Sequence, residues 1–161
     1  MKKQTNLVIA FILLILVNGC SGYKPIFGSI DLQFEISQYS IEGNQILGKK
    51  IYRKLNNFLK KTKAKKNVRK ITLLINVSKD KKASLKNSAG KITEYKIFLK
   101  TEVEVKDFMT NDKILNQTFS NSSSYRVQKQ YSKTIKLENL STETMLEKTY
   151  QDLLIKLSQN I

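Results

Sequence analysis

Cys20 is the only cysteine of this 161-residue chain, and its chemistry can be tested first against the composition. A single cysteine forms no internal disulfide. The chain also contains no histidine, so a Cys-His nucleophilic pair, a Ser-His-Asp triad and most zinc sites lack a necessary member. The sequence therefore predicts no enzyme activity, no metal site and no cofactor, and the thiol needs another explanation.

The residues before Cys20 have the pattern of an export signal. Two lysines stand near the start, and an apolar segment of eleven residues, 7–17, follows them. Because a helix needs about 20 residues to span a bilayer, this segment is too short to be a transmembrane helix. Residues 17–20, Val-Asn-Gly-Cys, resemble the lipobox of bacterial lipoproteins, although Asn18 is a less usual member of that motif.

The lipobox resemblance implies that residues 1–19 are a signal peptide and that Cys20 becomes an acylated N-terminus, with residues 20–29 as its tether. Several acyl chains, at about 0.8 kcal/mol per buried methylene, anchor a protein far more firmly than one chain. Ser21 is not the aspartate associated with inner-membrane retention, so outer-membrane localisation is expected, with residues 30–161 as a single periplasmic domain. The alternative is an ordinary secretory signal, which would leave a free thiol in an oxidising compartment.

Lysine dominates the charge of the chain, since 26 lysines and three arginines stand against 13 acidic residues. Removal of the signal peptide takes away two lysines and lowers the net charge from +16 to +14. A surplus of this size attracts polyanions. Two interpretations stay open: a surface selected for phosphate-bearing ligands, or a solvated surface that reflects a lysine-rich genome. Nucleic acid is not expected as a partner, because the chain has an export signal and no recognisable nucleic-acid-binding module.

The hydropathy pattern predicts six elements in the order β-α-β-β-β-α. Apolar residues at every second position predict strands around residues 30–36, 71–77, 95–105 and 114–127. Apolar residues at helical spacing predict helices over residues 47–59 and 141–157, with Asn44 and Ser141 as N-caps. The polar and basic segment 80–90 is expected to connect two strands. Two helices packed on a mostly antiparallel four-stranded sheet, a two-layer α+β sandwich, would bury all of these apolar faces.

Residues 20–27, Cys-Ser-Gly-Tyr-Lys-Pro-Ile-Phe, resemble the phrase that opens the LPS-assembly lipoprotein family, LptE, with Ser21 inserted before the glycine. The similarity extends along the whole mature chain through the segments "LGKKIYRKLNNFL", "ITLLINV", "TEYKIFLKTEVEVKD" and "TYQDLLIKL". The resemblance implies a lipid-anchored, periplasm-facing outer-membrane protein that plugs the lumen of the β-barrel translocon LptD. It also implies that the protein helps this barrel to fold and binds lipopolysaccharide (LPS), without catalysing a reaction.

The resemblance also implies candidate LPS contacts. In the family, basic residues near the loop before the long central strand, and ahead of the final helix, are associated with LPS. The matching residues are Lys82, Lys86, Lys133 and Lys136, which we expect to form one phosphate-binding patch at one end of the domain. Lys86 stands where relatives often have arginine, so a point charge would replace a bidentate phosphate contact. For each lysine alone, a solvated surface position is the alternative.

Two other functions are compatible with a lipoprotein signal. One is a generic adaptor, such as a pilotin that escorts a secretin, whose positive charge serves only to associate with anionic membrane. The other is a lipid-binding domain. A pilotin is expected to be mostly helical, a lipid-binding domain to contain a wide apolar cavity, and a barrel plug to be a compact two-layer domain with an extended polar surface.

Overall fold

The computed structural model describes residues 32, 34–61 and 68–160, and the helices and strands discussed below lie in these ranges. Along the chain they are β1 (Phe34–Gly43), α2 (Gln45–Lys61), β2 (Arg69–Lys86), β3 (Ile92–Asp107), β4 (Lys113–Arg126) and α3 (Tyr131–Asn160). In the sheet the strands lie in the order β1-β2-β3-β4. The β1–β2 pair is parallel and the other two pairs are antiparallel.

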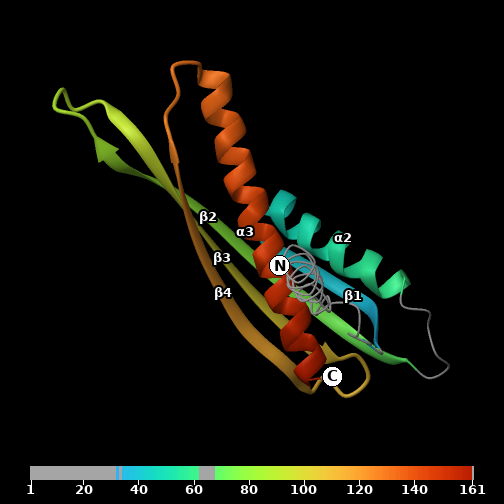
Figure 1. Cartoon of the computed structure of the whole chain (residues 1–161). Helices are drawn as coiled ribbons and strands as arrows, with labels where there is room; N and C mark the ends of the chain where they lie inside the picture. The colour runs from blue at the N-terminus through green and yellow to red at the C-terminus, as the bar shows by residue number, and fades with distance from the viewer. Residues whose placement is uncertain (1–31, 33, 62–67, 161) are drawn as a thin grey trace, which may run out of the picture. The chain divides into compact units, whose positions relative to one another are not determined.

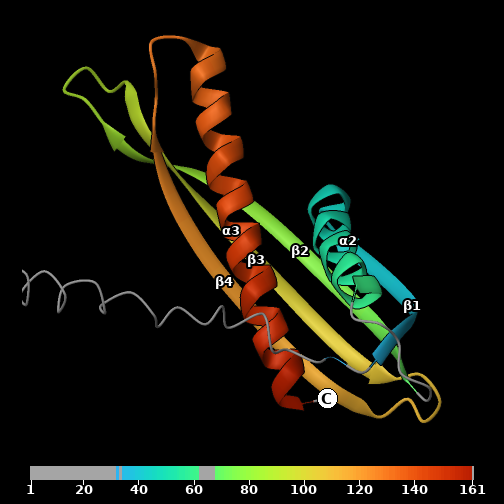
Figure 2. The ribbon, with the colours of Figure 1, turned by 45° about the vertical axis from the view of Figure 1, so that its right-hand side comes forward.

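Both helices cover the same face of the sheet, with α2 beside β1 and β2 and α3 crossing β3 and β4 (Figures 1 and 2). The other face carries no helix of the described ranges. The predicted two-layer α+β sandwich, with its order β-α-β-β-β-α and its mostly antiparallel sheet, is therefore confirmed. Within the described part of the chain, neither helix has the length and apolarity that crossing a membrane requires.

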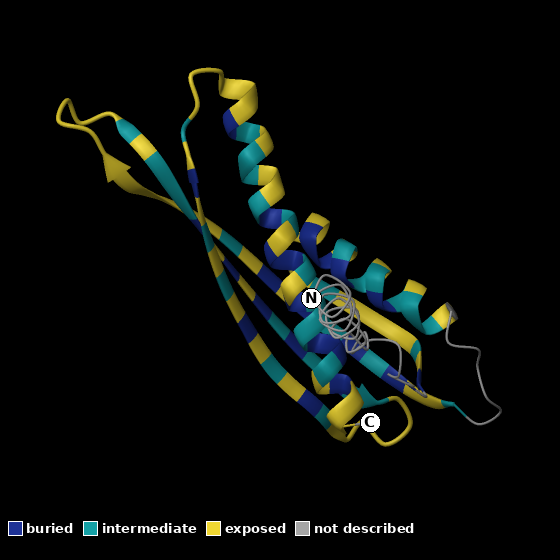
Figure 3. Cartoon of the chain, in the orientation of Figure 1, coloured by how far each residue is buried: buried dark blue, intermediate teal, exposed yellow. Residues whose placement is uncertain are grey.

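The period-two pattern of the central strands decides which sheet face is buried. In the central part of β2 and β3, nine side chains that face the helices are at most 1% exposed: Ile71, Leu73, Ile75, Val77, Ile97, Leu99, Thr101, Val103 and Val105. The helices supply the opposite side of this core, chiefly through Ile51, Leu55, Leu146, Leu153, Leu154 and Leu157. Figure 3 shows the resulting alternation of buried and exposed residues along the strands. Full burial of each large aliphatic side chain contributes about 1.5–3 kcal/mol.

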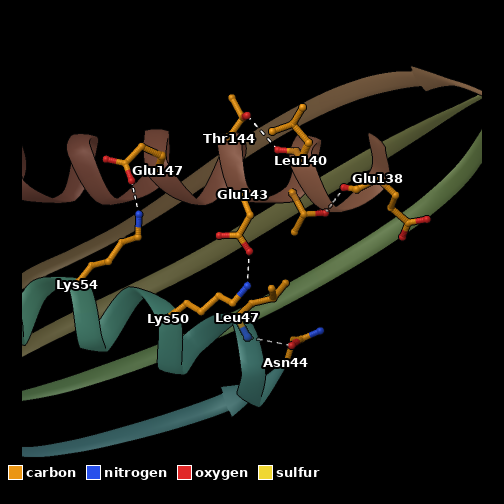
Figure 4. Close-up of polar contacts among 10 residues, drawn as sticks. Asn44, Leu47, Lys50, Lys54, Glu138, Leu140, Glu143, Thr144 and Glu147 are labelled. Carbon is orange, nitrogen blue, oxygen red and sulfur yellow. Dashed lines mark hydrogen bonds and ion pairs between the residues drawn. The ribbon is translucent and has the colours of Figure 1, made fainter. Parts of the chain in front are cut away.

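The link from β1 to α2 depends on Gly43 and Asn44. Gly43 has a φ of +66°, and the carbonyl oxygen of Val77 occupies the space that a Cβ would need, so only glycine fits without strain. The backbone N–H of Asn44 donates to that same carbonyl oxygen at 2.7 Å. Its side-chain Oδ1 accepts a hydrogen bond from the N–H of Leu47 at 3.1 Å (Figure 4). The prediction that Asn44 is the N-cap of the first helix, α2, is therefore confirmed.

The predicted end of the second strand near Val77 is wrong. β2 continues to Lys86, and its polar residues pair with β3 as far as Ile92. The physical reason is that backbone pairing does not require the alternating apolar pattern. After Val77 the helix-facing positions of β2 hold Lys79 and Lys81, which contact Glu138 of α3. The first strand also differs from its prediction, since it runs to Gly43, while residues 30, 31 and 33 lie outside the described residues.

The predicted start of the last helix at Ser141 is also wrong. The helix α3 begins at Tyr131, and Ser141 lies inside it. The N–H groups of Lys133 and Thr134 donate to the carbonyl oxygen of Gln130 at 3.1 and 3.3 Å. The early start was not visible in the sequence because the apolar stripe of this helix begins only at Met145.

Candidate functional site

The four predicted lysines lie in two segments that meet at one end of the sheet, and we call residues 79–96 and 126–138 the basic end. These segments hold ten basic and three acidic residues, a surplus of seven positive charges. They are brought together by strand pairing, since Glu94 pairs with Arg126. The N–H of Val127 also donates to the carbonyl oxygen of Thr93 at 2.9 Å. Figure 1 shows this end at the top, where the β2–β3 hairpin and the start of α3 extend beyond the rest of the sandwich.

Lys82 lies on the helix-free face of the sheet. Side chains alternate along a strand, and the preceding Lys81 faces α3. The ammonium groups of Lys82 and Lys96 lie 5.8 and 5.3 Å from the ring centroid of Phe98, which is 39% exposed. The expected single patch of four lysines is therefore divided by the sheet, with Lys82 on the face opposite to the helix that carries Lys133.

Lys86, Lys133 and Lys136 are all exposed, but they do not lie in loops. Lys86 is the last residue of β2, and the other two lie in the first two turns of α3. None of the three forms an ion pair with a carboxylate of the described residues. Lys133 lies in the first turn of α3, near the positive end of the helix dipole, and this turn contains no acidic residue to offset its charge. This arrangement is electrostatically unfavourable in the free protein and would be relieved by an anion.

A group that sequence reasoning missed lies between α3 and the sheet, and we call it the Glu138 cluster: Glu138, Lys79, Lys81, Tyr95 and Tyr125. Lys79 Nζ lies 2.8 Å from Glu138 Oε1, and Lys81 Nζ lies 2.7 Å from Oε2. The hydroxyl of Tyr125 donates to the same Oε2 at 2.8 Å. The Lys81 ammonium also stands 4.4 Å from the ring centroid of Tyr95 and 5.7 Å from that of Tyr125. The signal in the sequence was the period-two alternation, which places both lysines on the same face as Val77.

The Glu138 carboxyl group is ionised at neutral pH. Burial, which leaves the Glu138 side chain 14% exposed, raises its pKa. The hydrogen bonds from Lys79, Lys81 and Tyr125 outweigh burial and lower the pKa to about 2. The hydrogen bond to Glu138, followed by that to Tyr125, raises the pKa of Lys81 above its ordinary value. One carboxylate therefore faces two ammonium groups, and the cluster keeps a net positive charge.

Two further acidic residues of α3 connect it to α2. Lys50 pairs with Glu143, and Lys54 pairs with Glu147, one helical turn further along both helices (Figure 4). All four side chains are 40–45% exposed. Glu138, Glu143 and Glu147 are thus all used within the domain, which leaves the surface lysines of the basic end without acidic neighbours from α3.

The helix-free sheet face is polar. Its central groove is open and is lined by Glu42, Leu74, Ile75, Asn76, Glu102, Val103, Glu104, Asn116 and Thr118. Along β4 the residues of this face are Asn116, Thr118, Ser120, Ser122 and Ser124. Within the described residues, no group of three or more acidic or cysteine side chains is arranged to hold a metal ion. Cys20 lies outside the described residues, so its acylation stays a prediction.

No family model matches the chain, and no curated protein matches it in sequence. Solved structures do match its fold. Uncharacterized lipoprotein B from Nitrosomonas europaea has a TM-score of 0.60 and 16% identity over 83% of this chain and 88% of its own. Rare lipoprotein B from Shewanella oneidensis has a TM-score of 0.53 and 15% identity over 76% and 94%. A protein from Xanthomonas campestris has a TM-score of 0.51 and 7% identity over 80% and 88%. At these identities the likeness shows the fold alone.

Proposed function

We propose that this protein is an outer-membrane lipoprotein that faces the periplasm, plugs an LptD-like β-barrel, assists the assembly of that barrel and binds LPS, without catalysing a reaction. The observation that carries the proposal is the sheet face without helices, which presents polar side chains over three strands. The interiors of large outer-membrane barrels are polar and wet, so a polar face can be accommodated in such a lumen through hydrogen bonds and bridging water.

Two further observations support the lipoprotein part of the proposal. Residues 17–20 resemble a lipobox, and residues 20–27 resemble the opening phrase of the LptE family. Two of the proteins that share the fold are themselves named lipoproteins. The surplus of positive charge at the basic end supports the LPS part, because LPS carries phosphate groups that such a surface attracts.

The fold favours a barrel plug over the two rival functions. A pilotin is expected to be mostly helical, whereas this domain is built around four strands. A lipid-binding domain is expected to have a wide apolar cavity. The groove on the helix-free face is open and carries Glu42, Glu102 and Glu104 in its lining, so it is not a cavity of that kind.

Affinity purification tests the partner. The tagged full chain, extracted from outer membranes in mild detergent, is expected to bring down one large β-barrel in equimolar amount. Recovery of a secretin ring would overturn the proposal, and so would recovery of the protein without any barrel under conditions that keep known barrel complexes intact.

Labelling with a radioactive fatty acid tests the anchor separately. The wild-type chain is expected to incorporate the label, and Cys20→Ala is expected to remove it and to leave an uncleaved precursor. Undiminished label in Cys20→Ala would exclude Cys20 as the attachment site, whatever the barrel experiment shows.

A further inference from the structure

The first eleven residues of α3, 131–141, contribute little to the core. Thr134 is the one buried residue among them, and Tyr131 and Leu140 are 78% and 62% exposed. The rest of the helix is packed differently, with seven buried residues: Thr142, Met145, Leu146, Thr149, Leu153, Leu154 and Leu157. Segments with few buried apolar contacts open locally at a small fraction of the global unfolding free energy. The start of α3 can therefore separate from the sheet while the remainder stays packed.

The boundary between these two parts of α3 is a weak point of the helix. The hydroxyl of Thr142 donates to the carbonyl oxygen of Glu138 at 2.9 Å. The hydroxyl of Thr144 donates to the carbonyl oxygen of Leu140 at 3.0 Å (Figure 4). A hydrogen bond from a threonine hydroxyl to the carbonyl oxygen four residues earlier slightly destabilises a helix and often bends it. Ser141, which directly precedes Thr142, has a lower helix propensity than alanine or leucine. A hinge near residues 140–144 is therefore consistent with the local chemistry.

Glu138 makes the side-chain hydrogen bonds between the first part of α3 and the sheet, while Thr134 Oγ1 accepts one from the N–H of Gln128 in the segment after β4. The Glu138 carboxylate accepts hydrogen bonds from Lys79, Lys81 and Tyr125. Without it, two ammonium groups, a phenol hydroxyl and the ring of Tyr95 would line one site on the inner face of the sheet. Such a set of donors binds anions, and a phosphomonoester suits it better than a carboxylate does. It carries −1.5 to −2 charges, so it can neutralise both lysines, and it has three acceptor oxygens.

We propose that Lys79, Lys81 and Tyr125 form a phosphomonoester-binding site that the protein occupies with its own Glu138 carboxylate. When residues 131–141 lift from the sheet, the site becomes available to a ligand. Lys133 and Lys136 lie on the segment that lifts, so the incoming phosphate also attracts them. The apparent affinity of the closed protein is the intrinsic affinity reduced by the fraction of molecules that are open. This inference does not depend on the identity of the barrel partner.

Titration with inorganic phosphate tests the site on the full chain in mild detergent, by isothermal titration calorimetry at fixed ionic strength. Glu138→Gln is expected to bind phosphate about tenfold more tightly than the wild type, because it removes the internal competitor. Glu143→Gln is the matched control, since it removes the same charge from the same helix and also separates a lysine from its partner. It is expected to change the affinity less than about twofold. Equal gains in both variants would reduce the effect to bulk charge and overturn the proposal.

Two further variants test the donors. Lys79→Gln and Lys81→Gln are each added to Glu138→Gln, which gives two double variants. Each is expected to lose the gain in affinity, and retention of the gain would overturn the assignment of that lysine. If Glu138 is only a structural residue, Glu138→Gln loses stability without gaining affinity, which overturns the proposal as well.

Hydrogen exchange tests the opening. In Glu138→Gln, the amides of residues 131–141 are expected to exchange faster than in the wild type, while those of residues 145–157 stay protected. Unchanged exchange in the first segment would overturn the lifting step. A titration with glycerol 3-phosphate, the deacylated headgroup of phosphatidic acid, then distinguishes the source of the phosphate. Tighter binding than inorganic phosphate supports a lipid headgroup, and equal binding supports a site for phosphate alone.

Discussion

We call the described residues outside the basic end the body of the sandwich. The body and the basic end share the strands β2 and β3 and the helix α3, yet different forces hold helix and sheet together in each. In the body, aliphatic side chains at most 1% exposed fill the space between sheet and helices. Among the residues of the basic end, which the structure describes in full, Thr134 alone is buried. There the Glu138 cluster makes the principal contact between helix and sheet. The comparison teaches that the same helix and sheet can be held together by buried aliphatic side chains over one part of their length and by a polar cluster over another. Four predictions, given from the largest expected effect to the smallest, test this difference.

Leucines of the two regions should differ most in their contribution to stability. Leu99 is 1% exposed in the body and Leu85 is 56% exposed in the basic end. Leu99→Ala is expected to lower the free energy of unfolding by about 2–5 kcal/mol, because it leaves a cavity in a packed core. Leu85→Ala is expected to change it by less than about 0.5 kcal/mol. Urea unfolding measures both values, and similar losses would mean that the basic end is packed like the body.

Acid should loosen the basic end through Glu138, which faces Lys79 and Lys81 of β2, Tyr95 of β3 and Tyr125 of β4. Its folded pKa of about 2 lies below the ordinary value of 4.5. The ionised carboxylate therefore stabilises the fold above about pH 4.5, and this contribution is lost as the pH falls toward 2. The total is on the order of 3 kcal/mol, of which about 2 kcal/mol is lost by pH 3. Urea unfolding at pH 6 and pH 3 measures the loss.

The control for the acid effect is Glu138→Gln, which lacks the titrating group. Glu104 and Asp107 also have lowered pKa values, caused chiefly by hydrogen bonds from Lys113 and Arg69 respectively. These carboxyls titrate in both proteins, so the difference between wild type and Glu138→Gln isolates Glu138. The wild type should lose more stability between pH 6 and pH 3 than the variant. Equal losses would contradict the contact between Glu138 and the two lysines.

The exposed lysines of the basic end should matter for ligand binding and not for stability. Lys86→Glu with Lys136→Glu is expected to weaken LPS binding about tenfold, which corresponds to about 1.4 kcal/mol. The charge-matched pair Lys60→Glu with Lys156→Glu, on exposed positions of α2 and α3 outside the basic end, is expected to weaken it less than about twofold at physiological salt. Binding is measured on the full chain in detergent at fixed salt. Equal losses for the two pairs would assign LPS binding to bulk charge.

The ion pairs between the helices should contribute least. Lys50 and Glu143 are 42% and 45% exposed, so solvent screens their attraction. A double-mutant cycle with Lys50→Ala and Glu143→Ala is expected to give a coupling energy of about 0.2–1 kcal/mol. A coupling above about 2 kcal/mol would show that the helices of the body depend on surface charge and not chiefly on their buried aliphatic side chains.

The local patterns of the sequence were sufficient for most of the body. Alternation predicted the buried faces of β2 and β3, helical spacing predicted α2, and Asn44 was recognised as its N-cap. These features follow from neighbours a few residues apart, since side-chain direction repeats every two residues in a strand and every three to four in a helix. The order of the elements and the apolar face of each then restricted the fold to a two-layer sandwich.

The basic end was decided only by the tertiary structure. The pattern did not predict that β2 continues to Lys86 or that α3 begins at Tyr131, because neither extension buries an apolar stripe. The contacts of Glu138 with Lys79 and Lys81 join residues 59 and 57 positions apart. No local period carries such a pair, which forms only when α3 crosses the sheet at one angle and one register. The sequence by itself thus determined where apolar surface is buried, because that choice is local. The tertiary structure decided which charges meet, because electrostatic partners are selected by position in space.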